Sequence, residues 1–77
     1  MTTDELRTYL LNTLPPVICR KGVEDLTGGL IKATTLAFED HQGTGPTEGR
    51  FKQKRKVFYA REPFVNWFIE KTESIDV

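Results

Sequence analysis

The sequence has few of the features that would cross-link or anchor a chain: it has one cysteine, one histidine and no long apolar run. A single cysteine cannot form an internal disulfide, and together with one histidine it does not supply the ligands of a zinc site. The longest uncharged run, Thr8 to Cys19, contains two prolines and is shorter than the roughly 20 apolar residues of a spanning helix. The first turn is acidic, where a secretory leader would be basic. We therefore expect a cytoplasmic protein with no metal, no cofactor and no membrane partner.

The length of the chain limits the number of domains. With 77 residues it has room for one small hydrophobic core, so a two-domain organisation is excluded. Hydrophobic residues make up 38% of the sequence, which is enough to form a core and argues against disorder. We expect one compact domain.

Charge is distributed very unevenly along this chain. Eleven basic and eleven acidic residues give a net charge of zero, but six of the basic residues lie between Arg50 and Arg61, a segment without any acid. The rest of the chain therefore has a net charge of −6. Exposed charges act over about a Debye length, roughly 8–10 Å in cellular salt, so a basic segment attracts polyanions even on a neutral protein. Nucleic acid is the first candidate partner.

The first half of the sequence predicts three helices. Thr2 and Glu5 have the spacing of a capping box, and a helix is expected from Thr3 to Thr13, before Pro15 and Pro16. The apolar run 17–19 fits either a short strand or the start of the next helix. A short helix over 20–27 with a glycine stop, and another over 33–42 with Thr34 and Thr35 as capping residues, have the form of a helix-turn-helix unit.

The second half predicts a β-hairpin followed by a helix. Alternation in the segment 50–60 places Val57 and Tyr59 on the inner face of the hairpin. Its tip, 53–55, contains no glycine, which argues against a tight two-residue turn. Pro63 fits the first position of a final helix whose aromatic side chains belong to the core.

From Val17 to Lys71 the chain resembles the small winged helix-turn-helix proteins of phage excisionases and AlpA-type prophage regulators, which are related to the MerR DNA-binding domain. The resemblance rests on four motifs and their order: Gly28-Gly29 before Leu30-Ile31, Thr35-Leu36-Ala37, Gly43-Thr44-Gly45-Pro46, and Arg55-Lys56-Val57-Phe58-Tyr59 leading to Arg61 and Trp67-Phe68. It implies an α+β fold with three to four short helices and a two-stranded β-hairpin wing. The expected organisation is an N-terminal helix and connector (1–16), a winged helix-turn-helix domain (17–73) and a frayed tail (74–77).

The resemblance also implies a function. In this family the second helix of the unit enters the major groove of duplex DNA and the wing lies along the backbone or minor groove. The protein would act as a prophage-type transcriptional regulator or as an excisionase, with an integrase or recombinase, or copies of itself on adjacent sites, as further partners. Self-contact would use the N-terminal helix, through Leu6, Tyr9 and Leu10. The expected phosphate contacts are Arg50, Lys52, Lys54, Arg55 and Lys56.

Base contacts are expected from the predicted helix 33–42 and from the residue before it. The candidates are Lys32, Thr34, Thr35 and Phe38, with His41 as a further one. Glu39 or Asp40 would accept a hydrogen bond from a cytosine amino group.

Two other functions fit the same sequence. Phe51, Phe58 and Tyr59 among cations could stack on the bases of single-stranded DNA or RNA. Alternatively the basic patch could meet an acidic protein in a phage interaction module, which the acidic second helix would favour. The lone cysteine and histidine do not form an evident nucleophile and base pair, so we expect a binding protein and not an enzyme.

Overall fold

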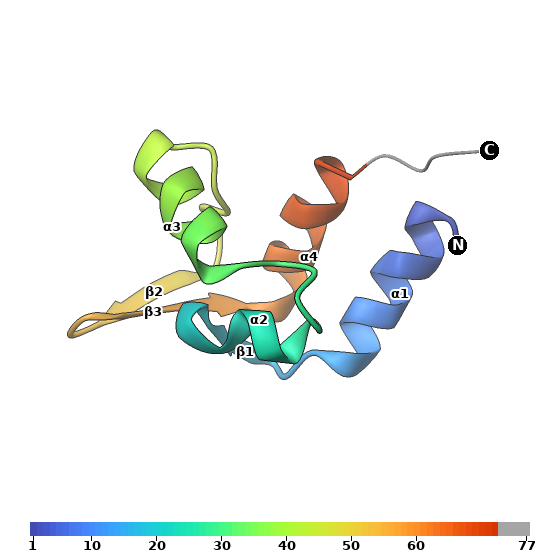
Figure 1. Ribbon diagram of the computed structural model, residues 1–77, viewed down its shortest axis with the longest axis horizontal. Helices are drawn as coiled ribbons and strands as arrows, with labels where there is room; N and C mark the ends of the chain where they lie inside the picture. Colours follow the sequence, from blue (N-terminus) through green and yellow to red (C-terminus); the bar gives the residue numbers. More distant parts are fainter. Residues whose placement is uncertain (73–77) are drawn as a thin grey trace.

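The computed structural model describes residues 1–72 and gives an α+β fold (Figure 1). The residues expected to fray, 74–77, lie outside the described part of the chain. Within residues 1–72 there are four α-helices, one 3₁₀ turn and one three-stranded antiparallel sheet. In chain order the elements are α1 (Thr3–Thr13), β1 (Val17–Cys19), the 3₁₀ turn (Arg20–Gly22), α2 (Val23–Leu26), α3 (Ala33–Gln42), β2 (Arg50–Gln53), β3 (Lys56–Ala60) and α4 (Arg61–Glu70).

The sheet has one strand more than the predicted two-stranded wing. β1 joins the hairpin, and the strand order is β1-β3-β2. Ile18 of β1 pairs with Tyr59 of β3, which in turn pairs with Arg50 of β2. The run 17–19 fits either a strand or the start of a helix by sequence, because three apolar residues show no periodicity that separates the two. The structure shows the strand, and its pairing with β3 is the part that the sequence did not predict.

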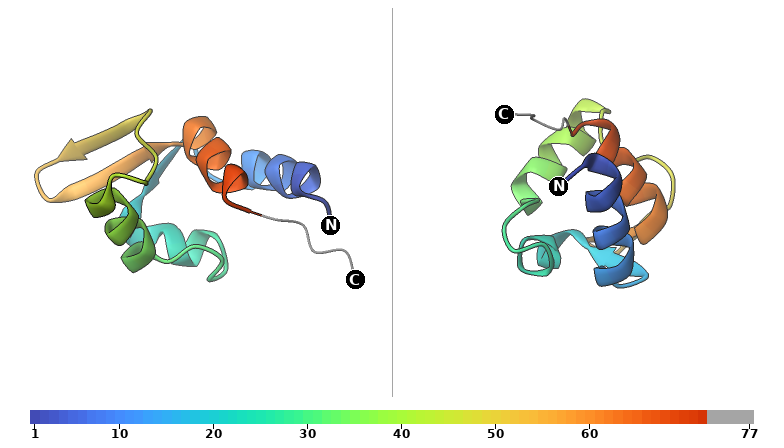
Figure 2. Two further views of the ribbon diagram at one scale, coloured as in Figure 1. Left: turned by 90° about the horizontal axis from the view of Figure 1, so that it is seen from above. Right: turned by 90° about the vertical axis from the view of Figure 1, so that its right-hand side faces the viewer.

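The hairpin of β2 and β3 extends away from the helices at one end of the molecule, opposite α1 (Figures 1 and 2). Its turn is tight, because Gln53 pairs with Lys56 and only Lys54 and Arg55 lie between the strands. The prediction against a two-residue turn is therefore wrong. The turn forms without glycine because Lys54 adopts φ +56°, the left-handed region that L-residues rarely enter.

The helices lie where the sequence predicts them, but some of them begin or end at other residues. The bounds predicted for α1 and α3 are confirmed, including the capping box of Thr2 and Glu5. The predicted helix 20–27 is split: a 3₁₀ turn runs to Gly22 and α2 follows, since glycine weakens the first turn. The cap of α3 is Lys32, so Thr34 and Thr35 lie inside the first turn and are not capping residues.

The last helix starts earlier than predicted. α4 begins at Arg61, so Pro63 is its third residue and not its first. Proline is tolerated there because the first-turn N–H groups have no acceptor inside the helix. The backbone N–H of Arg61 instead donates to the Pro16 carbonyl, at 2.9 Å, which joins the start of α4 to the segment before β1.

A single core holds all of these elements together. Leu10 and Leu14 of the N-terminal segment are buried with the rest, so α1 packs on the protein's own core, mainly against α4. Arg7 of α1 donates to Asn66 of α4 at 3.0 Å. No helix in the described residues is both long and apolar enough to cross a membrane. The buried side chains are Leu10, Leu14, Ile18, Val23, Ile31, Leu36, Tyr59, Phe64 and Val65.

The left-handed backbone at Lys54 makes a testable prediction about stability. An L-residue in this region is destabilised by about 1–2 kcal/mol, whereas a new glycine costs about 0.4–1 kcal/mol of unfolded-state entropy. Lys54→Gly should therefore raise the free energy of unfolding by about 0.5–1 kcal/mol, measured by urea denaturation. Arg55→Gly is the matched control, because Arg55 has a negative φ and only the entropy cost applies. A loss of stability in Lys54→Gly equal to that of the control would contradict this reading of the turn.

Candidate nucleic-acid interface

A groove runs between α3 and the hairpin. It consists of two adjoining hollows of about 390 and 340 Å³. Both are lined by Arg20, Ala37 and Val57, from the 3₁₀ turn, α3 and β3 respectively. The groove therefore combines one wall of helix, one wall of sheet, and the 3₁₀ turn that follows β1.

The lining of the groove is strongly basic. Among residues 1–72, six cationic side chains from three separate parts of the chain contribute to it, against one carboxylate, that of Asp40. Lysine and arginine side chains brought together in this way attract phosphate by charge, and arginine also by its fork of N–H donors. The six cations are Arg20, Lys21, Arg50, Lys52, Arg55 and Lys56.

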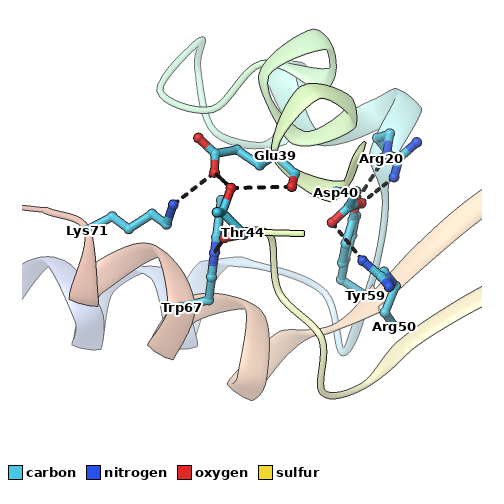
Figure 3. A network of polar contacts seen from close by, with 8 residues as sticks. All are labelled: Arg20, Glu39, Asp40, Thr44, Arg50, Tyr59, Trp67 and Lys71. Carbon is cyan, nitrogen blue, oxygen red and sulfur yellow. Dashed lines mark hydrogen bonds and ion pairs between the residues drawn. The ribbon is translucent and has the colours of Figure 1, made fainter. Parts of the chain in front are cut away.

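The Asp40 carboxylate lies at the back of this groove and receives three donors (Figure 3). Oδ1 accepts from Arg50 Nη1 at 2.9 Å. Oδ2 accepts from the Tyr59 hydroxyl at 2.6 Å and forms an ion pair with Arg20 Nη2. The Asp40 side chain is only 9% exposed, so the one acid of the groove is both shielded and neutralised.

Tyr59 and Arg20 complete a closed set of contacts with Asp40. Arg20 Nε donates to the Tyr59 hydroxyl at 3.0 Å, and the Tyr59 side chain is fully buried. Burial, reinforced by the hydrogen bond to Asp40, raises the pKa of Tyr59 to about 12. Burial alone would lower the pKa of Arg20, but its hydrogen bonds to Tyr59 and Asp40 outweigh this and the pKa is raised. At neutral pH Tyr59 is therefore an uncharged phenol and Arg20 a positively charged guanidinium.

Gly45 makes room for the Asp40 carboxylate. A Cβ atom placed on Gly45 would overlap Asp40 Oδ1 and lie 3.1 Å from the Asp40 backbone nitrogen. The Gly45 N–H donates to the Glu39 carbonyl at 3.1 Å, which holds the loop against the end of α3. The loop after α3 therefore needs glycine at position 45, because the Asp40 side chain approaches its backbone too closely for a Cβ atom. This explains the second glycine of the motif 43–46.

A second set of polar contacts joins the end of α3 to α4 (Figure 3). Glu39 accepts from Lys71 Nζ at 2.8 Å and from the Thr44 hydroxyl, and these two hydrogen bonds lower the pKa of Glu39. The Thr44 carbonyl accepts from Trp67 Nε1 at 2.8 Å. The half-buried Trp67 thus joins α4 to the loop after α3, consistent with the prediction that it packs with the core.

The acidic residues of α3 consequently face the scaffold. Glu39 binds Lys71 and Thr44, and Asp40 binds two arginines and Tyr59. Each carboxylate already accepts hydrogen bonds inside the protein, which argues against the expected role of either one as an acceptor for cytosine. The acidic residues of α3 were also the observation that favoured docking to a protein partner, and the same contacts weaken that alternative.

The predicted base-reading residues are all exposed but do not lie on one wall. Thr34 lines the groove, as do Ala37 and His41. Lys32, Thr35 and Phe38 are exposed without lining it, and the Phe38 side chain is 61% exposed. α3 therefore presents a broad solvent-facing surface that continues outward from the groove.

The predicted phosphate-contacting residues are brought together more closely. Arg50, Lys52, Arg55 and Lys56 line the groove, and Lys54 lies at the tip of the hairpin. Arg50 differs from the others because Asp40 already holds it. Arg61, which adds to the charge of the same segment, donates to the Leu14 carbonyl at 3.0 Å and belongs to the scaffold.

Two cations of the groove were not predicted from the sequence. Arg20 and Lys21 come from the 3₁₀ turn, about 30 residues before the basic segment, and only the pairing of β1 with β3 brings them beside the hairpin. The adjacent pair of cations before a glycine was the available signal. This pair falls in the predicted helix 20–27, and its place beside the hairpin depends on the long-range pairing of β1 with β3.

The chemistry of the groove is that of a site for an extended anion. Arginines held by Asp40 lie at its back and exposed lysines line it, so successive phosphates could be bound along its length. No protein family, curated protein or solved structure matches this chain.

Asp40→Asn tests the contacts at the back of the groove. The substitution keeps the shape of the side chain but leaves Arg20 and Tyr59 without their charged acceptor, and hydrogen bonds to charged groups contribute about 1.5–3 kcal/mol each. We expect the free energy of unfolding to fall by about 1–3 kcal/mol in total, because the arginines are partly solvated. Glu39→Gln is the control: its ion pair is more exposed, and its effect should be clearly smaller. Equal effects of the two substitutions would show that Asp40 has no special role.

The raised pKa of Tyr59 predicts a pH dependence of stability. A folded pKa of about 12 against an unfolded value of 10.0 means that the folded state holds the proton more tightly. This stabilisation is complete below pH 10.0 and is lost as pH rises towards 12. Denaturant unfolding across this range should show a fall in stability for the wild type that is reduced in Tyr59→Phe, which cannot ionise at this position. Parallel curves for the two proteins would contradict the assignment.

Proposed function

We propose that this protein is a winged helix-turn-helix protein that binds duplex DNA. In this proposal α2 and α3 form the helix-turn-helix unit, α3 is the recognition helix, and the hairpin of β2 and β3 is the wing. The order of elements and the antiparallel sheet are compatible with this fold.

The observation that carries the proposal is the basic groove between α3 and the hairpin. If α3 lies in a major groove, the phosphate backbone at its edge passes along the space between α3 and the wing. That space is lined by six cations and by one carboxylate that is already neutralised. Phosphate contacts of this kind fix the position and orientation of a protein on DNA.

The shape of α3 suits insertion into DNA. Its ten residues span about 15 Å at 1.5 Å per residue, and a major groove about 12 Å wide admits an α-helix. Hydroxyls at Thr34 and Thr35 could hydrogen-bond base edges, and the Phe38 ring could contact a thymine methyl group. Glu39 and Asp40 point to the scaffold, so they do not place negative charge on this surface.

The charge distribution over the molecule favours one orientation. The hairpin projects at one end, whereas Asp4 and Glu5 lie in the first turn of α1, at the other (Figure 1). A polyanion would attract the first end and repel the second. The proposed role, as a prophage-type regulator or an excision factor, rests on the resemblance of motifs; such a small module would need further copies or a recombinase partner to reach a specific affinity.

Salt dependence of duplex binding tests the proposal. If four or five phosphates are neutralised, log affinity should fall against log salt with a slope of about −3.6 to −4.5. In the double variant Lys52→Gln with Arg55→Gln, two groove cations are removed, and the slope should become shallower by about 2. Fluorescence anisotropy of a labelled duplex over a range of salt concentrations gives both values.

Arg7→Gln is the matched control for this measurement. It removes one positive charge, against two in the double variant, from α1 at the other end of the molecule, and it retains a donor for Asn66. Its slope and affinity should equal those of the wild type. Duplex binding that is absent, insensitive to salt, or weakened equally by the control would overturn the proposed site.

A further inference from the structure

The hairpin has a second face, which does not point into the basic groove. Side chains alternate along its strands, so Arg50, Lys52, Val57 and Tyr59 lie on the groove side. Phe51 and Phe58 therefore lie on the other side, directly opposite one another across β2 and β3. We call this side the outer face of the hairpin.

Phe51 is an unusual residue for an outer face. All four residues of β2 are exposed, and the Phe51 side chain remains 58% exposed in a protein whose small core could use every aromatic ring. Its cross-strand neighbour Phe58 is half-buried. Phe51 thus contributes little to the core. Together with Phe58 it forms a small apolar patch on the surface.

Cations lie next to Phe51 and Phe58, on the side toward the tip of the hairpin. Gln53 and Lys56 form the next pair on the outer face, and Lys54 and Arg55 make up the tip of the hairpin. These four residues line a hollow of about 500 Å³. The segment from Arg50 to Arg61 contains no acid, so the hairpin itself brings no negative charge to this face.

We propose that the outer face of the hairpin binds single-stranded nucleic acid, with one or more bases stacked on Phe51 and phosphates held by the cations at the tip. Aromatic rings beside a positively charged surface bind unpaired bases with little sequence preference. Bases within a duplex are already stacked on each other and do not offer their faces. The occupant is therefore a single strand. Arg55 and Lys56 line both the hollow at the tip and the groove proposed for duplex DNA, whereas Phe51 and Phe58 are not among the residues that line the groove.

Tyr59, which the sequence suggested as part of such a platform, is not available to it. Its side chain is fully buried on the groove side and hydrogen-bonded to Asp40. Of the three aromatic residues suggested by the sequence, Phe51 and Phe58 lie on the outer face. The charge of the surroundings complements a phosphate backbone and would repel the same basic hairpin of a second copy.

Substitutions of Phe51 separate stacking from simple apolar contact. Phe51→Ala removes the ring, Phe51→Leu keeps apolar area without a ring, and Phe51→Tyr keeps the ring. Because the side chain is exposed, all three should fold. Phe38→Ala is the matched control, since Phe38 is equally exposed but lies on α3. The probes are labelled oligothymidylate and oligouridylate of about 12 nucleotides, within the site sizes of such surfaces, and a labelled duplex.

We expect the wild type and Phe51→Tyr to bind a single-stranded probe alike, and Phe51→Ala and Phe51→Leu to bind it about tenfold more weakly or worse, as the loss of one stacked base implies. Duplex affinity should stay within about twofold in all three variants, and Phe38→Ala should leave single-strand affinity unchanged. The two single-stranded probes show whether DNA or RNA is preferred.

Several results would overturn the inference. The first is that the wild type does not bind single strands. The second is that Phe51→Leu binds single strands as tightly as the wild type. The third is that Phe51→Ala loses duplex and single-strand affinity equally. Phe51-dependent self-association of the free protein in sedimentation would assign the face to a second copy instead. If the protein binds single strands through Phe51 but binds no duplex, the result supports this inference and refutes the proposed function. If it binds duplex DNA but no single strand, the result refutes this inference and supports the proposed function.

Discussion

The Asp40 carboxylate is the contact on which the arrangement of helix and hairpin depends. It joins α3 to the 3₁₀ turn through Arg20, to β2 through Arg50 and to β3 through Tyr59. Gly45 leaves the space that this carboxylate needs. A single acid thus fixes one wall of the groove relative to the other, and it orients two guanidinium groups that repel each other when no anion lies between them.

This arrangement explains how a protein of zero net charge presents one strongly basic surface. Asp40 and Glu39 are used in contacts between elements, where their charges are compensated. The cations of the hairpin and the 3₁₀ turn remain at the surface of the groove. The two faces of the hairpin then differ in chemistry: one is basic and faces α3, and the other carries Phe51 and Phe58. We propose a different form of nucleic acid for each.

Local signals in the sequence predicted most of the fold. Prolines, glycines and the capping box located α1, α3 and the hairpin, because each acts on its own few residues. Long-range pairing was not predictable: the three residues of β1 have no periodicity, and Arg20 and Lys21 reach the groove only through that strand. The two-residue turn was missed because Lys54 adopts a left-handed conformation that residues other than glycine rarely enter. The internal role of Asp40 was missed because its partners lie far away in the chain.

The most direct test of the central claim is an amide chemical-shift titration of the labelled protein with duplex DNA. We propose that duplex DNA binds at the groove between α3 and the hairpin. The account therefore predicts the largest shifts in the exposed part of α3, in Arg20 and Lys21, and in 50–56, with α1 and the far end of α4 unchanged. Shifts that concentrate on α1 and α4, or that are absent from α3 while the hairpin alone responds, would contradict it.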